Sequence, residues 1–278
     1  MNLRRLSAAG ATAALAAGAL VGLGTSAASA ATVTNSYTCD LPKFDGLPPT
    51  FDTALTITGA LPITNGPSGL PVKAGLFGAE ASAAIDAQTA GILNAFGVTS
   101  ARADDFGFAV GKASTPLPLK GNVVNEGGAV AWKATGTNKA FVTPDAGQFK
   151  VLLPKTFTFI AETPSLGDVS IPCALKAGET QQSVGDLTLV KQTTKTTAKA
   201  KPKGKVTVTV TGNVSKATSG QVVVLDGKKV VGKANVKNGK AVVKLKKLSK
   251  GTHKLVASFK GNGSFGKSKS KPVKVVVK

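Results

Sequence analysis

The sequence predicts an all-β protein made of two β-sandwich domains in tandem, the first with a short helix and the second a Greek key. Short runs in which Thr, Val, Phe and Ile alternate with polar residues recur between Pro and Gly clusters. Charge divides the chain: residues 31–190 hold 10 basic and 13 acidic residues, whereas residues 191–278 hold 23 lysines and one acid, Asp226. A near-neutral body is therefore expected to precede a very basic domain.

Residues 1–30 have the three parts of a secretory signal peptide. A basic start, MNLRR, precedes an Ala-, Gly- and Leu-rich run, and Ala28-Ser29-Ala30 provides a small-x-small cleavage site. The run is diluted by Ala and Gly, which disfavours a permanent membrane span. We expect cleavage after Ala30 and a secreted chain, extracellular or associated with the cell wall, without a transmembrane segment.

Residues 31–190 are expected to form the first sandwich domain. Its Thr-, Val- and Phe-rich runs have the alternation of half-buried strands. Turn-forming dipeptides and tripeptides of Pro, Gly and Asn separate these runs. The predicted strands cover residues 31–38, 51–58, 106–110, 129–133, 148–153, 156–161 and 187–190.

One Ala-rich stretch, 79–96, has helical spacing. Its larger residues recur at intervals of three and four, which places them on one helical face, and Gly97 is a suitable residue to end the helix. Core packing is the expected role, and a partner-binding helix is the alternative. The predicted face consists of Ala81, Ile85, Thr89, Ile92 and Phe96.

The two cysteines, Cys39 and Cys173, lie near the ends of the first domain. Because two cysteines outside the cytosol usually pair, a disulfide is expected. It would close a loop of about 134 residues, for which chain entropy predicts roughly 4–5 kcal/mol of stabilisation. The sequence contains no C-x-x-C motif, so a redox or metal-binding role of the two cysteines is not indicated.

Residues 191–204, KQTTKTTAKAKPKG, contain no large apolar side chain. Such a segment is expected to be an extended, self-repelling linker between the domains. It would act as a solvated spacer or, alternatively, as a polybasic tether to an anionic surface.

Residues 205–278 have the clearest strand alternation and no helical segment. Asp226-Gly227 and Asn238-Gly239 are dipeptides typical of type I′ hairpins. A compact antiparallel Greek-key sandwich is predicted. Its strands are expected at residues 205–211, 221–225, 229–236, 240–246, 252–260 and 272–278.

The motifs G-x-V-x-V-x-D-G-x-K, N-G-x-A-x-V-x-L and G-T-H-x-L-x-A-S-F-x-G-N occur in this order within 205–278. With them the segment resembles the bacterial immunoglobulin-like (Ig-like) repeat domains of secreted, high-GC Gram-positive proteins, which implies an Ig-like sandwich. One departure is that lysines flank the G-N-x-x-F loop, where such repeats often carry Asp and aromatic residues.

The body is more loosely similar to a secreted, actinobacterial-type domain family of unknown function. Tyr37-Thr38-Cys39 and Ile171-Pro172-Cys173 match its paired Y-x-C and I-P-C motifs. This resemblance implies a β-sandwich and supplies no catalytic residues.

The sequence indicates no catalytic, cofactor-binding or metal-binding residues, and we expect a protein that is not an enzyme. With one His and two Cys, the chain cannot easily assemble a His-based zinc site, a Cys₄ cluster or a Ser-His-Asp triad chosen from several histidines. Calcium-loop, P-loop and nucleophile-elbow motifs are absent from the sequence. His253 is expected at the core or its edge. Asp104 and Asp105 are expected in a turn or as a solvated pair, since adjacent strand residues point to opposite faces. A hydrolase would need carboxylates brought together from distant segments.

The lysines are the remaining functional signal. They would attract a polyanion such as an anionic cell-wall polymer or acidic glycan, or only keep the domain soluble. Specific nucleic-acid binding is disfavoured because residues 191–278 contain no Arg, Tyr or Trp. The candidate polyanion-binding residues are Lys244, Lys246, Lys254, Lys260, Lys267, Lys269, Lys271, Lys274 and Lys278.

An alternative function places carbohydrate binding or adhesion on the body, with the basic domain as a spacer. Sugar-binding platforms usually use exposed aromatic rings, and among Trp and Tyr residues only Trp132 and Tyr37 are available. The sequence does not indicate an oligomeric state.

Overall fold

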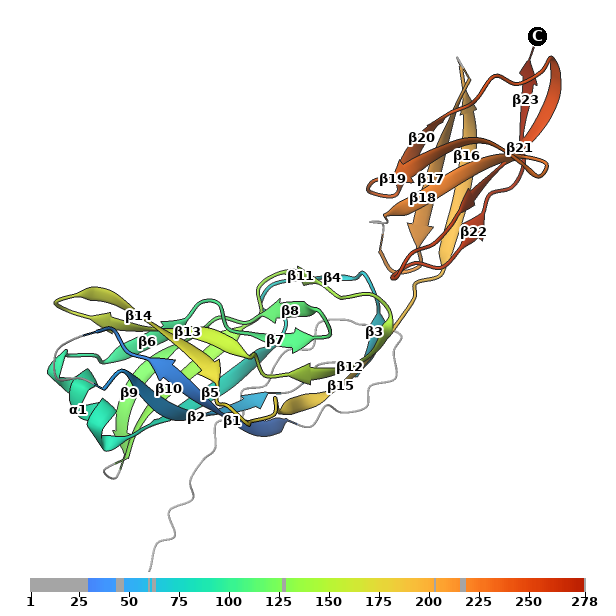
Figure 1. Cartoon of the computed structure of the whole chain (residues 1–278). Coiled ribbons are helices and arrows are strands. Elements are labelled where there is room, and N and C mark those ends of the chain that lie inside the picture. The colour runs from blue at the N-terminus through green and yellow to red at the C-terminus, as the bar shows by residue number, and fades with distance from the viewer. Residues whose placement is uncertain are drawn as a thin grey trace, which may run out of the picture.

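The computed structural model describes residues 30–43, 48–59, 61, 64–126, 129–202, 204–215 and 219–277. Residues 1–29 of the predicted signal peptide and Lys278 lie outside these residues. Within them the chain forms 23 strands and one helix, which confirms the all-β prediction. Two separate hydrophobic clusters define an N-terminal body and a C-terminal domain. Figure 1 shows the strands of these two units as separate groups. The described helix is too short to cross a bilayer.

Eight strands of the body form a closed barrel. Closure occurs because β1 (Ala31–Asp40) pairs with β2 (Thr50–Gly59) on one side and with β14 (Gly167–Leu175) on the other, which leaves no free edge in this sheet. The β-sandwich predicted for the body is thus formed largely by one sheet that closes on itself, so that its two opposite walls face each other across the core. In barrel order the strands are β1 (Ala31–Asp40), β14 (Gly167–Leu175), β13 (Thr156–Thr163), β6 (Ser100–Ala103), β9 (Leu119–Glu126), β10 (Ala129–Thr137), β5 (Gly78–Ile85) and β2 (Thr50–Gly59).

A second, five-stranded sheet and a two-stranded ribbon extend the body beside the barrel (Figure 1). Residues of this sheet, including Phe108 and Val151, belong to the same hydrophobic cluster as the barrel interior. The sheet contains β3 (Asn65–Pro67), β15 (Ser183–Val190), β12 (Gly147–Leu152), β7 (Gly107–Val110) and β8 (Ala113–Pro116), and the ribbon contains β4 (Pro71–Val72) and β11 (Phe141–Val142).

The helix predicted over 79–96 is wrong in its first half. Residues 79–85 belong to strand β5, and only α1 (Ala87–Ala95) is helical. Ala79, Ala81 and Ala83 occupy alternate positions of β5 and are all buried, and small side chains fit the inside of a narrow barrel. Asp86 marks the change, because its Oδ1 accepts hydrogen bonds from the backbone N–H groups of Gln88 and Thr89, each at 2.9 Å.

The buried helix residues are Thr89 and Leu93, so the predicted apolar face is only partly correct. The predicted end of the helix is confirmed. Gly97 follows the C-cap with φ +67°, a conformation that glycine adopts without steric cost.

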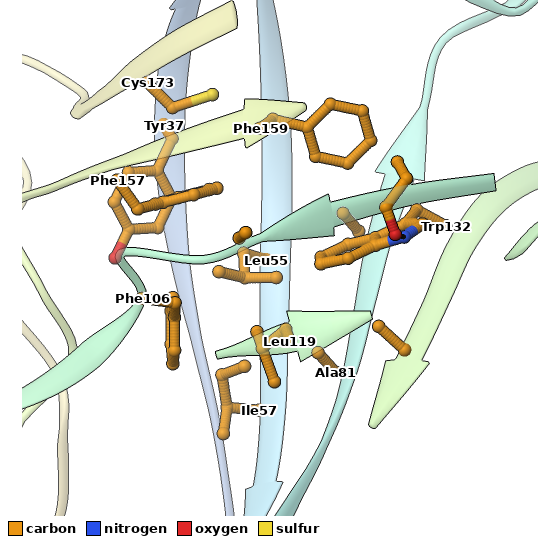
Figure 2. Packing of buried hydrophobic residues seen from close by; sticks show 14 of the residues in the cluster. Tyr37, Leu55, Ile57, Ala81, Phe106, Leu119, Trp132, Phe157, Phe159 and Cys173 are labelled. Carbon is orange, nitrogen blue, oxygen red and sulfur yellow. Dashed lines mark hydrogen bonds between the residues drawn. The ribbon is translucent and has the colours of Figure 1, made fainter. Parts of the chain in front are cut away.

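Aromatic rings fill the barrel and meet edge to face (Figure 2). The ring centroids of Tyr37 and Phe157 are 5.0 Å apart, as are those of Trp132 and Phe159. Both polar ring atoms are satisfied: Tyr37 Oη donates to a backbone carbonyl at 2.7 Å, and Trp132 Nε1 donates to another at 3.1 Å. The rings therefore supply apolar contact area without an unpaired buried donor.

The predicted disulfide between Cys39 and Cys173 is confirmed. The two residues lie directly opposite each other where β1 pairs with β14, and both are buried. The bond thus links the first strand of the barrel to the last one in the chain.

The C-terminal domain is a sandwich of a three-stranded and a five-stranded sheet. Its core is mostly valine, and the predicted inward residues Val206, Val208 and Val210 are at most 1% exposed. The first sheet contains β16 (Thr194–Lys201), β17 (Lys205–Gly212) and β20 (Lys240–Lys244); the second contains β19 (Lys229–Val236), β18 (Gly220–Asp226), β21 (Gly251–Phe259), β22 (Ser268–Lys269) and β23 (Val273–Val277).

The predicted linker at 191–204 is wrong for most of its length. Residues 194–201 form strand β16, which pairs with β17 from Thr194↔Gly212 to Lys201↔Lys205. Inward positions of β16 carry small residues such as Thr196, which is 4% exposed. An edge strand needs little apolar bulk when a partner strand supplies its backbone hydrogen bonds, so the lack of large apolar residues was misleading.

One of the two predicted type I′ turns is confirmed. Asn238 and Gly239 both have positive φ, at 48° and 74°, as this turn requires. The other loop is centred one residue later, because Asp226 pairs with Lys229. Of its central residues only Gly227 has positive φ, so the turn is not type I′.

A polar junction joins the body to the C-terminal domain. Gln192, 1% exposed, lies between β15 and β16. Its Nε2 donates to the carbonyl of Ser68 at 2.8 Å, and its Oε1 accepts from the N–H of Ser215 at 3.1 Å. A second contact is the 2.6 Å hydrogen bond that Ser264 Oγ donates to Asp145 Oδ1. The two units are thus linked by side-chain contacts as well as by the chain.

Candidate functional site

The described residues contain no group of three or more His, Cys, Asp or Glu side chains that could hold a metal ion. The barrel core encloses a cavity of about 20 Å³ beside Trp132, Phe159 and Leu93, which has room for about one water molecule. A larger space of about 370 Å³ is an open depression on the barrel wall lined by Lys120 and Thr135 among others.

The acidic doublet lies in a turn, as expected, and its side chains have different partners. Asp104 forms an ion pair with Arg102 Nε at 3.0 Å. Asp105 accepts hydrogen bonds from the backbone N–H and the hydroxyl of Thr158, at 2.8 and 2.9 Å. The two carboxylates are held by structural contacts rather than aimed at one common point.

Arg102 on β6 is the centre of an ion-pair network that the sequence did not reveal. Its guanidinium contacts Glu162 at 3.0 Å and also pairs with Asp168, while Lys120 lies 3.2 Å from Glu162. Hydrogen bonds from Ser100, Lys120 and Arg102 lower the pKa of Glu162, and the bond from Arg102 lowers the pKa of Asp168. The members come from distant strands, so no local motif could have identified them.

His253 lies at the edge of the C-terminal core, as expected, and its side chain is 11% exposed. Its Nδ1 is 2.6 Å from Asp226 Oδ2, and its Nε2 is 2.9 Å from the carbonyl oxygen of Ser249. The carboxylate and carbonyl oxygens both accept hydrogen bonds, so both bonds form when the ring is an imidazolium with a proton on each nitrogen. These bonds, with the one to Ser249 foremost, raise the pKa of His253. The sole acid of residues 191–278 is therefore already paired.

The structure places the predicted lysines on the surface but not on one common face. Lys254 and Lys274 are brought directly opposite each other on β21 and β23, whereas Lys244 lies on β20 in the other sheet. Within the described residues, no lysine after residue 190 forms an ion pair. The eight predicted lysines that are described, all exposed, are Lys244, Lys246, Lys254, Lys260, Lys267, Lys269, Lys271 and Lys274.

Sequence reasoning did not place five further lysines on the outer side of the three-stranded sheet. Three of them lie on β16, inside the segment interpreted as a linker. The sequence did contain one indication of this arrangement: the three lysines lie even numbers of positions apart, which places them on one face if the segment is a strand. The five exposed residues are Lys195, Lys199, Lys201, Lys205 and Lys240.

The aromatic sugar-binding platform considered for the body is ruled out for its two candidate residues. Trp132 and Tyr37 are both 0% exposed and pack inside the barrel (Figure 2). Their rings stabilise the core and cannot stack on a glycan at the surface.

Comparison with known proteins assigns a family to the C-terminal domain. Residues 187–278 match the bacterial Ig-like domain (group 3), which includes the strand first interpreted as a linker. No curated protein matches the chain.

Among solved structures, the chain is similar to a protein from Corynebacterium diphtheriae provisionally described as membrane anchored. The identity is 16% and the TM-score 0.36, and the match covers 89% of this chain and 59% of the other. The chain thus spans less than two thirds of that structure. The family assignment applies to the C-terminal third of the chain: these residues form a bacterial Ig-like domain.

Proposed function

We propose that the protein is a secreted, non-enzymatic component of a bacterial cell envelope or extracellular matrix. In this proposal its Ig-like domain associates with anionic surface polymers, and the disulfide-closed barrel is the part presented outward. Residues 1–30 would direct export, and the Cys39–Cys173 bond is consistent with an oxidising compartment.

The observation that carries the proposal is the uncompensated charge of the Ig-like domain. Residues 191–278 hold 23 lysines and one acid, and that acid, Asp226, is paired with His253. The described lysines of this region are all exposed. A surface of one sign attracts oppositely charged polymers, with an affinity that falls as salt increases.

The body supports the proposal by contrast. Its acidic groups compensate its basic ones in ion pairs such as Lys176–Asp52 and Lys133–Glu126, at 2.6 and 2.5 Å. The attraction for a polyanion is therefore expected to come from the Ig-like domain.

Cosedimentation of the purified chain with isolated Gram-positive cell walls tests the proposal. We expect the protein to pellet at low salt and to be released at high salt. Walls stripped of their anionic polymers provide the control and should retain little protein. If the chain stays in the supernatant at low salt with intact walls, the proposed function is wrong.

A further inference from the structure

We infer that one surface of the Ig-like domain, the outer side of its three-stranded sheet, binds the polymer, and that it takes a linear polymer with phosphodiester charges in its backbone. This inference rests on the proposed function and narrows it to one binding face. We call this surface the lysine face; its charged members are Lys195, Lys199, Lys201, Lys205, Lys240 and Lys244.

Strand register brings three of these lysines into one row across the sheet. Lys201 lies directly opposite Lys205, and Lys205 lies directly opposite Lys244. Directly opposite residues on one face have Cβ atoms about 4.5–5.5 Å apart, and like charges in such pairs are destabilising. The row therefore places three positive charges where folding alone would disfavour them.

Nothing acidic on the lysine face relieves this repulsion. The next row consists of Lys199, Thr207 and Val242, and the row after it contains Thr197, Thr209 and Lys240. Threonine and valine supply no negative charge, and Asp226 belongs to the other sheet. A bound polyanion would remove the repulsion as it adds attraction.

The chemistry of the lysine face favours phosphodiesters over sugar rings. Residues 191–278 contain no Trp or Tyr, and the two Phe rings, Phe259 and Phe265, are buried. The face thus has no aromatic side chain for a sugar ring to stack on, whereas lysine binds a phosphate as a point charge. Alternate residues along a strand are about 6.6–6.8 Å apart, so the lysines suit a polymer with a charge on every short repeat.

The outer side of the five-stranded sheet is a natural comparison within the same domain. Lys254 and Lys274 lie directly opposite each other there, but as a pair rather than as a row of three. Exposed valines occur on both surfaces, Val230 and Val276 here and Val242 on the lysine face, so the row of three opposed lysines is what distinguishes the two. The five-stranded sheet therefore provides a matched control for the loss of charge.

The experiment compares two fourfold Lys→Gln variants of the full chain, which remove equal charge. The first, Lys199→Gln, Lys201→Gln, Lys205→Gln and Lys244→Gln, neutralises the lysine face. The control, Lys233→Gln, Lys254→Gln, Lys269→Gln and Lys274→Gln, neutralises the five-stranded sheet. Binding to soluble polyglycerol phosphate is measured by titration at several salt concentrations.

We expect the lysine-face variant to lose about tenfold more affinity than the control and to depend less steeply on salt, because fewer counterions are released. We also expect its thermal midpoint to stay equal or to rise, because the cross-strand repulsion is gone. A lower midpoint would contradict the repulsion argument.

The remaining outcomes separate the inference from the proposed function. Equal losses in the two variants would overturn the lysine face while leaving polyanion binding intact. Equal affinity of the wild-type chain for polygalacturonate would overturn the assignment to phosphodiesters. Absence of wild-type binding to both polymers, even at low salt, would count against the proposed function itself.

Discussion

The barrel and the Ig-like domain are both built of strands, yet they are stabilised and charged in different ways. Large aromatic rings and a disulfide stabilise the barrel, and its exposed charges form pairs and a network around Arg102. The Ig-like domain has a valine core without a disulfide, and its described lysines have no ion-pair partners. The comparison shows that the excess positive charge is confined to the surface of one domain. The stability of each domain depends on its own core.

The largest expected effect tests whether the two cores are independent. Phe157 contacts Tyr37 and Phe106 in the barrel, so Phe157→Ala should lower the free energy of unfolding of the barrel by about 3–5 kcal/mol through lost contacts and a cavity. Trp132 is the only tryptophan, and its fluorescence during urea unfolding reports on the barrel alone.

The matched control is Phe259→Ala in the Ig-like domain, where Phe259 is 0% exposed. This variant should shift a second transition in far-ultraviolet circular dichroism and leave the Trp132 transition nearly unchanged. Equal shifts of the Trp132 transition in both variants would show that the two domains unfold as one unit.

Removing the disulfide should have the next largest effect. The double variant Cys39→Ala and Cys173→Ala is expected to lower the free energy of unfolding of the barrel by about 2–5 kcal/mol. The Trp132 transition measures this change, and the transition of the Ig-like domain serves as the internal control. An unchanged barrel transition would mean that barrel closure by β1 and β14 does not depend on the bond.

A smaller effect concerns pH and the Ig-like domain alone. The pKa of His253 is raised above its ordinary value near 6.5 by the bonds to Ser249 and Asp226. Its stabilising contribution is therefore complete below the pKa of the unfolded chain and is lost as pH rises through the raised pKa of the folded state. The melting temperature of the Ig-like domain should fall over that interval.

His253 is the only histidine, so its ring protons can be followed by NMR without further assignment. Asp226→Asn should lower the pKa of His253, and His253→Gln should flatten the pH dependence of melting. A wild-type pKa at or below the ordinary value would contradict the imidazolium geometry.

The smallest expected effect lies in the exposed network of the barrel. Arg102→Gln should raise the pKa of Asp168 more than that of Glu162, because Glu162 keeps its bonds to Ser100 and Lys120. Both carboxylates stabilise the fold above their unfolded pKa values, and this contribution is lost as pH falls through their lowered folded values. NMR titration of the side-chain carboxyl carbons measures the shifts.

Lys120→Gln is the control for the network. It should raise the pKa of Glu162 and leave that of Asp168 almost unchanged, since the main partner of Asp168 is Arg102. A larger change at Asp168 than at Glu162 would contradict the arrangement of the network.

Local patterns predicted the fold where a strand is long and alternates clearly. The inward valines of β17 agree with the pattern, because alternation directly determines which side faces the core. The predicted bounds of the strand from Lys229 to Val236 are also correct, although its burial does not alternate strictly. The Ala-rich stretch before α1 failed this test. Alanine fits a helix and a tight barrel equally well, so only the pairing of β5 with β2 and β10 decided its conformation.

By itself, the sequence determined the all-β class, the disulfide pair and the concentration of positive charge after residue 190, because composition and alternation are local properties. Only the tertiary structure decided that residues 194–201 form a strand, and therefore that their lysines share a face with Lys205 and Lys244. Cross-strand register depends on partners far along the chain, and no local pattern contains it. For the same reason, the burial of Trp132 and the network around Arg102 became visible only once distant strands were placed side by side.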